Sequence, residues 1–376
     1  MRYQSTVFGQ LLKAVPRGWF DRTARLLRVG RRKHALNEWG HLVAMVGAQL
    51  TGARSLRDLE RVLDRHPGVL AHLGFVGAAR STLADANANR PVALFEAVAG
   101  KLCSAFAGRS VGAQALRLID ATRIYAGKRV EAWAKGAVKL HLGLDPRQQR
   151  PTWFAVTSER VNDITAAKAM PVEAGATYVF DKGYYDFAFW ATLDAAGCRF
   201  VTRLKRNSPT TLVRRRRVRD AGVLFDRVVT LSQRLGGQRR NPFQGEVRLI
   251  GVQLNAGREI TLLTNDLTTS AGEIAELYKA RWQVELFFKW IKQNLKLAHF
   301  FGTSRNALTI QIMAALIAYL LLRLANVAQP AGLGLQALAR LMPALLFARR
   351  PLAAIMTGQP PPIQTLTSRQ CELTYA

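Results

Sequence analysis

The chain has 376 residues, of which 49% are hydrophobic, enough for a large folded core spread over two or three domains. Fifty-four Lys and Arg against 25 Asp and Glu give a formal charge of +29, so nucleic acid is the expected partner ahead of a membrane surface. Three cysteines without metal-ligand spacing exclude a disulfide framework and a zinc site, and we expect no export signal in the first twenty residues.

The N-terminal hundred residues have a helical pattern. Residues 38–50 place apolar side chains on one face of a helix. After a short turn a second helix is expected over 55–63, where Ser55 can act as the N-cap and Asp58 as its reciprocal capping partner. Two helices joined by a Gly-containing turn are typical of a helix-turn-helix DNA reader, although plain helix packing is the commoner use of such a pair. A third helix is expected to start near Pro91.

The pattern then changes to alternating strands and helices. Strands are expected at 115–120, 137–145, 151–158, 177–181 and 198–205, and helices at 163–170 and 182–197. This order predicts an α/β fold. Residues 207–267 carry further strand-like segments, 223–232, 246–254 and 259–265, which indicate a β-rich insertion.

Helical pattern returns at Ser270, a good N-cap with Glu273 three residues later, and continues through residue 293. The remainder is mostly helical. Its most apolar run, Ile312 to Leu322, is shorter than the ~20 residues needed to cross a bilayer, so we expect a buried helix and no membrane partner.

Three acidic residues occupy positions where α/β proteins commonly carry functional side chains. Asp120 and Asp181 each end a predicted strand, and Glu285 lies on the helix that follows the insertion. Three converging carboxylates would repel one another unless a cation lay between them, and Mg²⁺ is the natural ion for such oxygen ligands. Taken singly, each Asp could be a turn or cap residue and Glu285 could pair with Arg281 or Lys289.

The helix around Glu285 has a further pattern. Tyr278, Arg281, Glu285 and Lys292 are separated by helical spacings and fall within one strip about 60° wide, beside a broad apolar face. A carboxylate in that strip can hold a metal ion while the flanking cations bind phosphates. We assign Trp282, Phe287 and Phe288 to the core.

A strongly basic stretch precedes the insertion strands. Residues 199–219 contain nine Arg or Lys and no acid, including Arg214, Arg215, Arg216 and Arg217. A solvated hairpin is the plain interpretation, and a clamp on the DNA backbone is the interpretation that we favour.

These motifs together resemble a known family. The spacing Tyr-x₂-Arg-x₃-Glu-x₆-Lys is similar to the signature of the IS4-type DDE transposases in all four letters and all three gaps. IDATRI at 119–124 resembles the first Asp motif of the family, and FDKGYYDF at 180–187 resembles the second. The segments RYQSTVFGQLL, AQLTGARSLRDLE and STLADANANRP resemble the helical N-terminal domain of one subgroup, so the resemblance covers about residues 3–330.

The resemblance implies an α/β, RNase H-like catalytic core interrupted by a β-rich insertion. The implied divisions are a helical N-terminal domain that is a candidate for DNA binding (1–75), a helical connector (76–112), the first part of the core (113–206), the insertion (207–268), the catalytic helix (269–300) and a helical C-terminal region with a tail (301–376).

The resemblance also implies the chemistry. Asp120, Asp181 and Glu285 would be catalytic ligands of two Mg²⁺ ions, with Mn²⁺ as a substitute, and Tyr278, Arg281 and Lys292 would contact DNA near the cleaved end. The enzyme would cut at terminal inverted repeats and join the 3′ ends to target DNA. Members of the family act on double-stranded DNA as homodimers, and we expect a cytoplasmic, nucleoid-associated bacterial protein.

Two rival functions stay open at this point. One is a catalytically inactive DNA-binding relative, and the other is a metal-dependent DNA nuclease that cuts without strand transfer. Strand-transfer product separates the transposase from both rivals.

Overall fold

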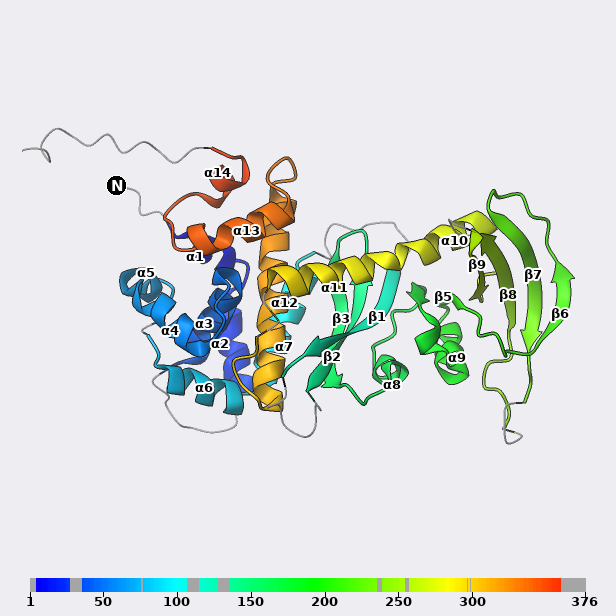
Figure 1. Ribbon diagram of the computed structural model, residues 1–376, viewed down its shortest axis with the longest axis horizontal. Coiled ribbons are helices and arrows are strands. Elements are labelled where there is room, and N and C mark those ends of the chain that lie inside the picture. Colours follow the sequence, from blue (N-terminus) through cyan, green and yellow to red (C-terminus); the bar gives the residue numbers. More distant parts are fainter. Residues whose placement is uncertain are drawn as a thin grey trace, which may run out of the picture.

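The computed structural model of the protein describes residues 5–27, 36–75, 77–106, 115–127, 136–234, 239–253, 257–295, 297 and 299–359. Figure 1 shows a helical half beside a half built on one large sheet. The helical half contains α1 (Val7–Leu12), α2 (Arg17–Leu26), α3 (Glu38–Thr51), α4 (Leu56–Asp64), α5 (Pro67–Ala71), α6 (Arg80–Asn89), α7 (Val92–Ser104), α12 (Arg305–Ala328), α13 (Leu335–Leu345) and α14 (Leu352–Met356).

Helix α12 joins the two halves. It stands between the other helices and the sheet (Figure 1), and every residue from Ala307 to Leu322 is buried. The helix is long and apolar enough to cross a membrane, but 89% of its apolar window is buried inside the protein, so it is a core helix. The expectation of a buried helix around Ile312–Leu322 is therefore confirmed.

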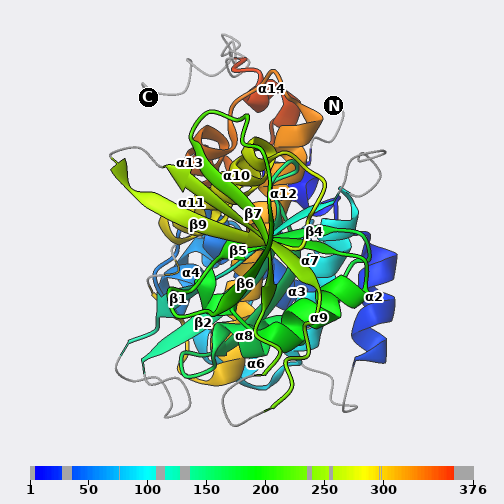
Figure 2. The same cartoon turned by 90° about the vertical axis from the view of Figure 1, so that its right-hand side faces the viewer.

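The sheet has nine strands in the described residues, in the order β3-β2-β1-β4-β5-β9-β8-β7-β6. They are β1 (Leu116–Tyr125), β2 (Ala137–Asp145), β3 (Arg150–Ser158), β4 (Thr177–Phe180), β5 (Arg199–Arg203), β6 (Thr210–Arg215), β7 (Val223–Leu231), β8 (Glu246–Gln253) and β9 (Glu259–Thr264). β1, β4 and β5 pair in parallel, and all other pairs are antiparallel. Figure 2, seen from the end that carries β6, shows the strands fanned by the usual twist.

Helices cover the two faces of the sheet. α10 (Ala271–Ala280) and α11 (Trp282–Asn294) run along one face, and α8 (Asp163–Lys168) and α9 (Phe187–Ala195) lie on the other (Figure 1). Leu118, Val179 and Val201 share a core with α11, whereas their strand neighbours Ile119, Phe180 and Phe200 pack into the core of the opposite face. The mixed α/β architecture agrees with the expected class.

The described elements agree with most of the expected strands and helices, with four differences. The strand expected to end at Asp120 continues to Tyr125, and the helix expected over 182–197 begins only at Phe187, where Asp186 caps it. Strand β6 was not expected, because its TTLVRR sequence is exposed along its whole length and lacks alternation. The helix expected from Ser270 to residue 293 is divided at Arg281, where Arg281 N–H donates to Tyr278 O and Val284 N–H donates to Arg281 O, both at 3.1 Å. These i to i−3 bonds tighten the backbone by one 3₁₀-like turn.

The insertion strands do not form a separate sheet. β9 pairs with β5, so β6–β9 extend the sheet that begins with β1–β5. The basic residues of β6 consequently lie at the far edge of that sheet.

A buried ion pair ties the insertion to the start of α10. Asp226 on β7 accepts from Arg248 Nε at 2.7 Å and from Nη2 at 2.6 Å, and both side chains are almost fully buried. Arg248 Nη1 also donates to Thr269 O, one residue before the N-cap Ser270. Asp220, just before β7, accepts from Gly272 N–H in the first turn of α10. The insertion thus fixes where the catalytic-motif helix begins.

We expect Asp226→Asn to lower the free energy of unfolding by about 3–5 kcal/mol, because it leaves Arg248 as an uncompensated buried charge. Urea denaturation measures the loss. Glu246→Gln is the control, because it breaks an exposed pair with Arg214 and should change stability by less than about 1 kcal/mol. Equal losses in the two variants would contradict this role for the buried pair.

Candidate active site

Two of the three predicted acids lie on neighbouring parallel strands. Leu118 pairs with Val179 and Ile119 with Phe180, so Asp120 and Asp181 follow at matched positions of β1 and β4. Neighbouring strands are separated by about 4.8 Å. The parallel register therefore brings together two carboxylates that are far apart in the chain.

The alternation of the strands decides which face the acids share. Ile119 and Phe180 pack on the α8 and α9 face, whereas Leu118 and Val179 pack on the α11 face. Because successive side chains of a strand point to opposite faces, Asp120 continues the direction of Leu118, toward α11. Asp181 accepts from Gly183 N–H at 2.7 Å, and this bond orients its carboxylate at the strand exit.

Glu285 reaches the same place from α11. Val284 and Ile291 bury the opposing side of the helix in the core. Arg281, at the break before α11, pairs through Nη2 with Glu285 Oε1 at 2.6 Å and through Nη1 with Asp120 Oδ2 at 3.6 Å. One guanidinium therefore contacts both a strand carboxylate and the helix carboxylate.

Burial and the neighbouring charges set the electrostatics of the cluster. Burial raises the pKa of Asp120 to about 6; the Ala121 N–H and Arg281 oppose the rise, and the neighbouring charges of Asp181 and Glu285 add to it. Tyr184 lies beneath the cluster, with a buried hydroxyl that has no partner in the described residues. Burial, and then the nearby charge of Asp120, raise its pKa far above the ordinary range of a tyrosine.

The remaining residues of the helical strip lie around this cluster. Tyr278 is half-buried, its ring is 5.8 Å from the Arg281 guanidinium carbon, and burial raises its pKa. Lys292 Nζ donates to Thr122 Oγ1 of β1 at 2.7 Å, and partial burial lowers its pKa. The structure therefore brings Tyr278, Arg281 and Lys292 to the same edge as the carboxylates.

The four basic residues 214–217 lie elsewhere. β6 is five strands away from β4, about 24 Å along the sheet. Arg214 pairs with Glu246 at 2.9 Å on the surface, and Arg216 pairs with buried Asp226 at 3.5 Å and donates to Leu267 O. Arg215 and Arg217 are exposed. Of the four, Arg216 is held by Asp226 and Leu267, between the insertion and α10, while Arg215 and Arg217 are exposed to solvent.

One aromatic residue was assigned wrongly from the sequence. Phe287 and Phe288 are buried, as expected, but Trp282 is 55% exposed. On a helix, Trp282 lies about 40° from Tyr278, outside the apolar face. The angular spacing that defined the polar strip could therefore have identified Trp282 as a surface residue beside the acids.

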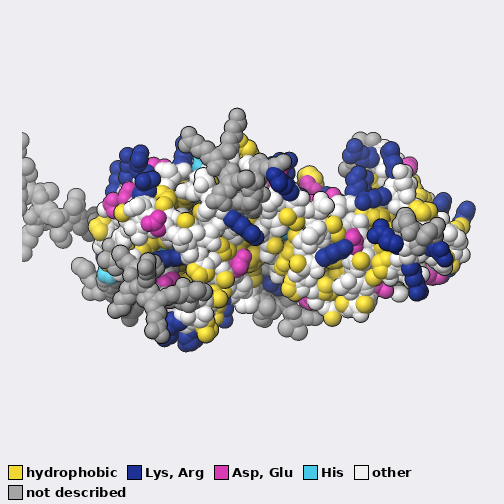
Figure 3. Space-filling model, turned by 90° about the horizontal axis from the view of Figure 1, so that it is seen from below, with side chains coloured by type: hydrophobic (Ala, Val, Ile, Leu, Met, Phe, Trp, Pro, Cys, Tyr) yellow, Lys and Arg dark blue, Asp and Glu magenta, His cyan; other side chains and the backbone are white. Residues whose placement is uncertain are grey.

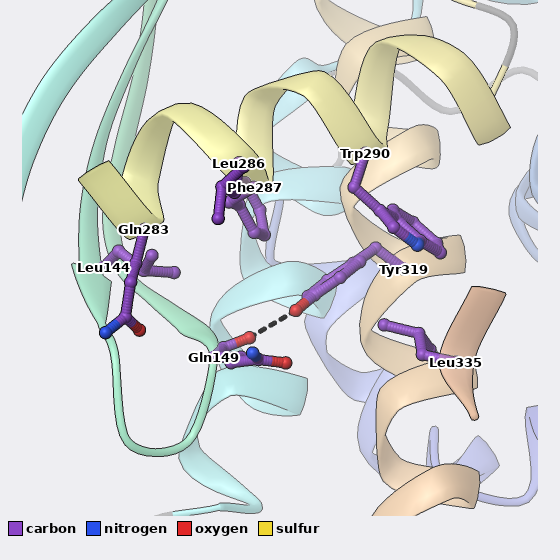
Figure 4. Close-up of a pocket in the computed structure, with 8 residues that line it drawn as sticks. All are labelled: Leu144, Gln149, Gln283, Leu286, Phe287, Trp290, Tyr319 and Leu335. Carbon is purple, nitrogen blue, oxygen red and sulfur yellow. Dashed lines mark hydrogen bonds between the residues drawn. The ribbon is translucent and has the colours of Figure 1, made fainter. Parts of the chain in front are cut away.

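A separate cavity of about 350 Å³ lies behind α11, between the β2–β3 turn, α12 and α13 (Figure 4). Its lining is mostly apolar, and Tyr319 OH donates to Gln149 O across it. Leu286, Phe287 and Trp290 face this cavity from the side of α11 that is turned away from Glu285. The cavity lacks acidic or basic lining residues and is distinct from the carboxylate cluster.

The donor set of the cluster suits a hard divalent cation. It consists of carboxylate oxygens from β1, from the residue after β4 and from α11, without Cys or His. Within the described residues, no three potential ligands are already gathered closely enough to hold a metal ion. The guanidinium of Arg281 lies between two of the carboxylates and shows that this position attracts a cation.

The sequence is similar to known proteins over most of its length. A family model described as a transposase DDE domain matches residues 112–321, and one described as a domain of unknown function matches residues 3–76. A Sinorhizobium fredii protein named as transposase y4zB is 40% identical over 289 residues, 75% of this chain and 80% of the relative. A Geobacillus stearothermophilus protein named as a transposase for insertion sequence element IS5377 is 31% identical over 214 residues, 55% of this chain and 56% of that protein.

Among solved structures, the chain is similar to a piggyBac transposase synaptic complex with hairpin DNA. The TM-score is 0.45 and the sequence identity is 13%, over 98% of this chain and 87% of that one.

The raised pKa of Asp120 gives a pH-dependent prediction. Between its ordinary value of 3.8 and about 6, the folded chain binds a proton more readily than the unfolded chain, so stability falls as pH rises through that window. In metal-free protein at pH 7.5, Asp120→Asn should raise the free energy of unfolding by ~1–3 kcal/mol, and the gain should vanish toward pH 4. Urea denaturation at both pH values tests this, with exposed Asp85→Asn as control; a less stable Asp120→Asn protein at pH 7.5 contradicts it.

Proposed function

The chain belongs to the IS4-type DDE transposase family and is a DNA transposase of an insertion sequence, and we propose that Asp120, Asp181 and Glu285 carry its cutting and joining reactions. The observation that supports this proposal is that Asp120 and Glu285 both contact the guanidinium of Arg281. Asp181 directly follows the adjacent parallel strand β4. In our proposal the three carboxylates hold two Mg²⁺ ions, for which Mn²⁺ can substitute.

When bound, two such metal ions would activate the attacking hydroxyl and stabilise the leaving 3′ oxygen of a phosphodiester. The chain's own residues orient the DNA at that point. Lys292, held against Thr122, supplies a point charge for a phosphate, and Tyr278 borders the same edge. Exposed Trp282 offers an aromatic face beside the acids on which a base can stack.

We propose that β1–β5, α10 and α11 form an RNase H-like core. The order β3-β2-β1-β4-β5, with the first three strands antiparallel and the next two added in parallel, supports this fold. The proposed divisions are an N-terminal domain of residues 1–75, a connector of 76–112, core segments of 113–206 and 269–300, an insertion of 207–268 and a C-terminal region of 301–376. Residues 360–376 of that last region lie outside the described residues.

DNA leaving the carboxylates toward the insertion would pass its basic edge. Figure 3 shows Lys and Arg side chains gathered at the end of the molecule formed by β6–β9. The distance of about 24 Å from β4 to β6 corresponds to about seven base pairs of a duplex. We propose that Arg215 and Arg217 bind the DNA backbone there, and that Arg214 joins them when it leaves Glu246.

A second candidate DNA-binding surface lies on the N-terminal domain, where α4 carries arginines together with the acids Asp58, Glu60 and Asp64. Residues Trp39 to Leu50 of α3 are all buried, so α3 cannot enter a DNA groove. α4 buries Leu56, Leu59 and Leu63, and its opposite side exposes an arginine row. That row consists of Arg57, Arg61 and Arg65, which lie within about 80° of one another, and they form no ion pair with any described residue. We propose that α4 is the DNA-facing helix of this domain.

We further propose that the protein acts as a homodimer on double-stranded DNA in the bacterial cytoplasm, each subunit holding one transposon end.

The central experiment uses labelled duplexes that carry the inverted repeats flanking the coding region. With Mg²⁺, the protein should cleave at the repeat and give strand-transfer product. Asp181→Asn and Glu285→Gln should each lower cleavage by a factor on the order of 10³ while DNA binding persists, because the carboxylates act on chemistry more than on affinity. Glu276→Gln, an exposed carboxylate on α10, is the control.

Each result has a definite meaning. Cleavage near the wild-type rate in either variant rejects that ligand. Wild-type binding without cleavage indicates an inactive DNA-binding relative, and cleavage without joining indicates a nuclease.

The arginine row of α4 makes a prediction of its own. The triple change Arg57→Ala, Arg61→Ala, Arg65→Ala should weaken DNA binding and reduce the slope of log K against log salt by about 0.9 for each phosphate that the variant can no longer neutralise. Arg340→Ala, an exposed arginine on α13, should leave the slope unchanged. An unaltered slope in the triple variant would remove α4 from the DNA interface.

A further inference from the structure

Arg281 holds an unusual place for a residue expected to contact DNA. Its side chain is 17% exposed, and its two terminal nitrogens point at Glu285 and Asp120 rather than outward. The side chains of Asp120 and Glu285 are 19% and 33% exposed, so the three groups share a partly desolvated space. A phosphate could reach this guanidinium only if the side chain left the carboxylates.

Arg281 is also incompletely bonded where it lies. Its Nε is buried and has no acceptor in the described residues, and the contact at 3.6 Å with Asp120 is long for a hydrogen bond. The nearest aromatic face, that of Tyr278, is 5.8 Å away. The two carboxylate contacts are thus the main interactions that keep the side chain in this position.

A permanently placed arginine in the same protein has a different environment. Arg248 is 1% exposed, bonds both oxygens of Asp226 with short paired contacts, and also donates to Thr269 O. Arg248 therefore satisfies its donors in one fixed geometry, as a structural guanidinium does. Arg281 has one short contact, one long contact and one unsatisfied donor.

The backbone at Arg281 supports movement of its side chain. Arg281 lies at the break between α10 and α11, in the tightened turn where Arg281 N–H bonds to Tyr278 O. Val284, which follows in α11, is buried in the core, so movement of the guanidinium toward solvent would have to come from the Arg281 side chain and this turn.

We propose that Arg281 is a displaceable counterion: it neutralises Asp120 and Glu285 in the metal-free protein, and entry of divalent cations expels it, which makes its guanidinium available to a DNA phosphate. The proposal rests on the proposed function, because it requires these carboxylates to be metal ligands. It adds an order of events to that function: the metal ions bind first, and Arg281 binds a DNA phosphate afterwards. Arginine and metal ion then compete for the same oxygens, so removing one raises the affinity for the other.

The test measures Mn²⁺ binding in the absence of DNA, by calorimetry or by the disappearance of the free-ion electron paramagnetic resonance signal. Arg281→Gln should bind Mn²⁺ roughly tenfold more tightly than the wild type, because no side chain has to be expelled. The metal-free variant should melt at a lower temperature than the wild type, and Mn²⁺ should raise its melting temperature by more. Arg281→Ala gives a second variant, and circular dichroism checks that both are folded.

Lys292→Ala is the matched control. Lys292 is the other motif cation, but it bonds Thr122 and contacts no described carboxylate. It should leave Mn²⁺ affinity within about twofold of wild type; an increase as large as that of Arg281→Gln would show a general charge effect and overturn the proposal.

The outcomes separate this proposal from the function on which it rests. Wild-type Mn²⁺ binding that Asp181→Asn weakens, together with unchanged or weaker binding in Arg281→Gln, rejects the counterion role and leaves the metal site in place. No Mn²⁺ binding by the wild-type protein would overturn both.

Discussion

The parallel pairing of β1 with β4 is the constraint on which the site depends. It sets Ile119 against Phe180, and the next residues, Asp120 and Asp181, thereby meet although sixty residues of chain separate them. Parallel strands need a crossover, and here β2, β3 and α8 provide it. The buried Phe180 and its aromatic neighbours on the α9 face fix the register, because a slip of one residue would exchange the two faces of the strand.

The helix that carries Glu285 needs a second constraint, because 67 residues intervene between the end of β5 and the start of α10. Acidic residues of the insertion provide this constraint by bonding to the segment where α10 begins. Asp226 holds Arg248 against the segment before α10, and Asp220 caps the first turn of the helix. Asp266 lies in the same connection; burial alone would raise its pKa, but hydrogen bonds from Thr269 and Thr268 outweigh burial and lower the pKa to about 2. The insertion therefore positions the helices that carry Tyr278 and Glu285 while it extends the sheet.

Gathering carboxylates lowers stability, and the structure shows how the chain tolerates this. Burial and the neighbouring acids favour the protonated form of Asp120, so the charged cluster is unfavourable without a cation. Arg281 partly offsets that repulsion through its contacts with Asp120 and Glu285. A cluster of this kind favours added positive charge, in agreement with the proposal that its carboxylates hold hard cations.

The sequence by itself determined the strand that ends before Asp181, the helical strip of Glu285 and the family, because these depend on local periodicity and motif spacing. It placed Asp120 on the right strand but at its end, whereas β1 continues to Tyr125 by pairing with β2. Tertiary structure alone decided which partners they meet. The pairing of β9 with β5, the exposure of Trp282 and the position of Arg281 between two carboxylates all arise from contacts between segments distant in sequence. Local patterns fix a backbone conformation and a face, whereas burial and charge pairing depend on every element that packs against that face.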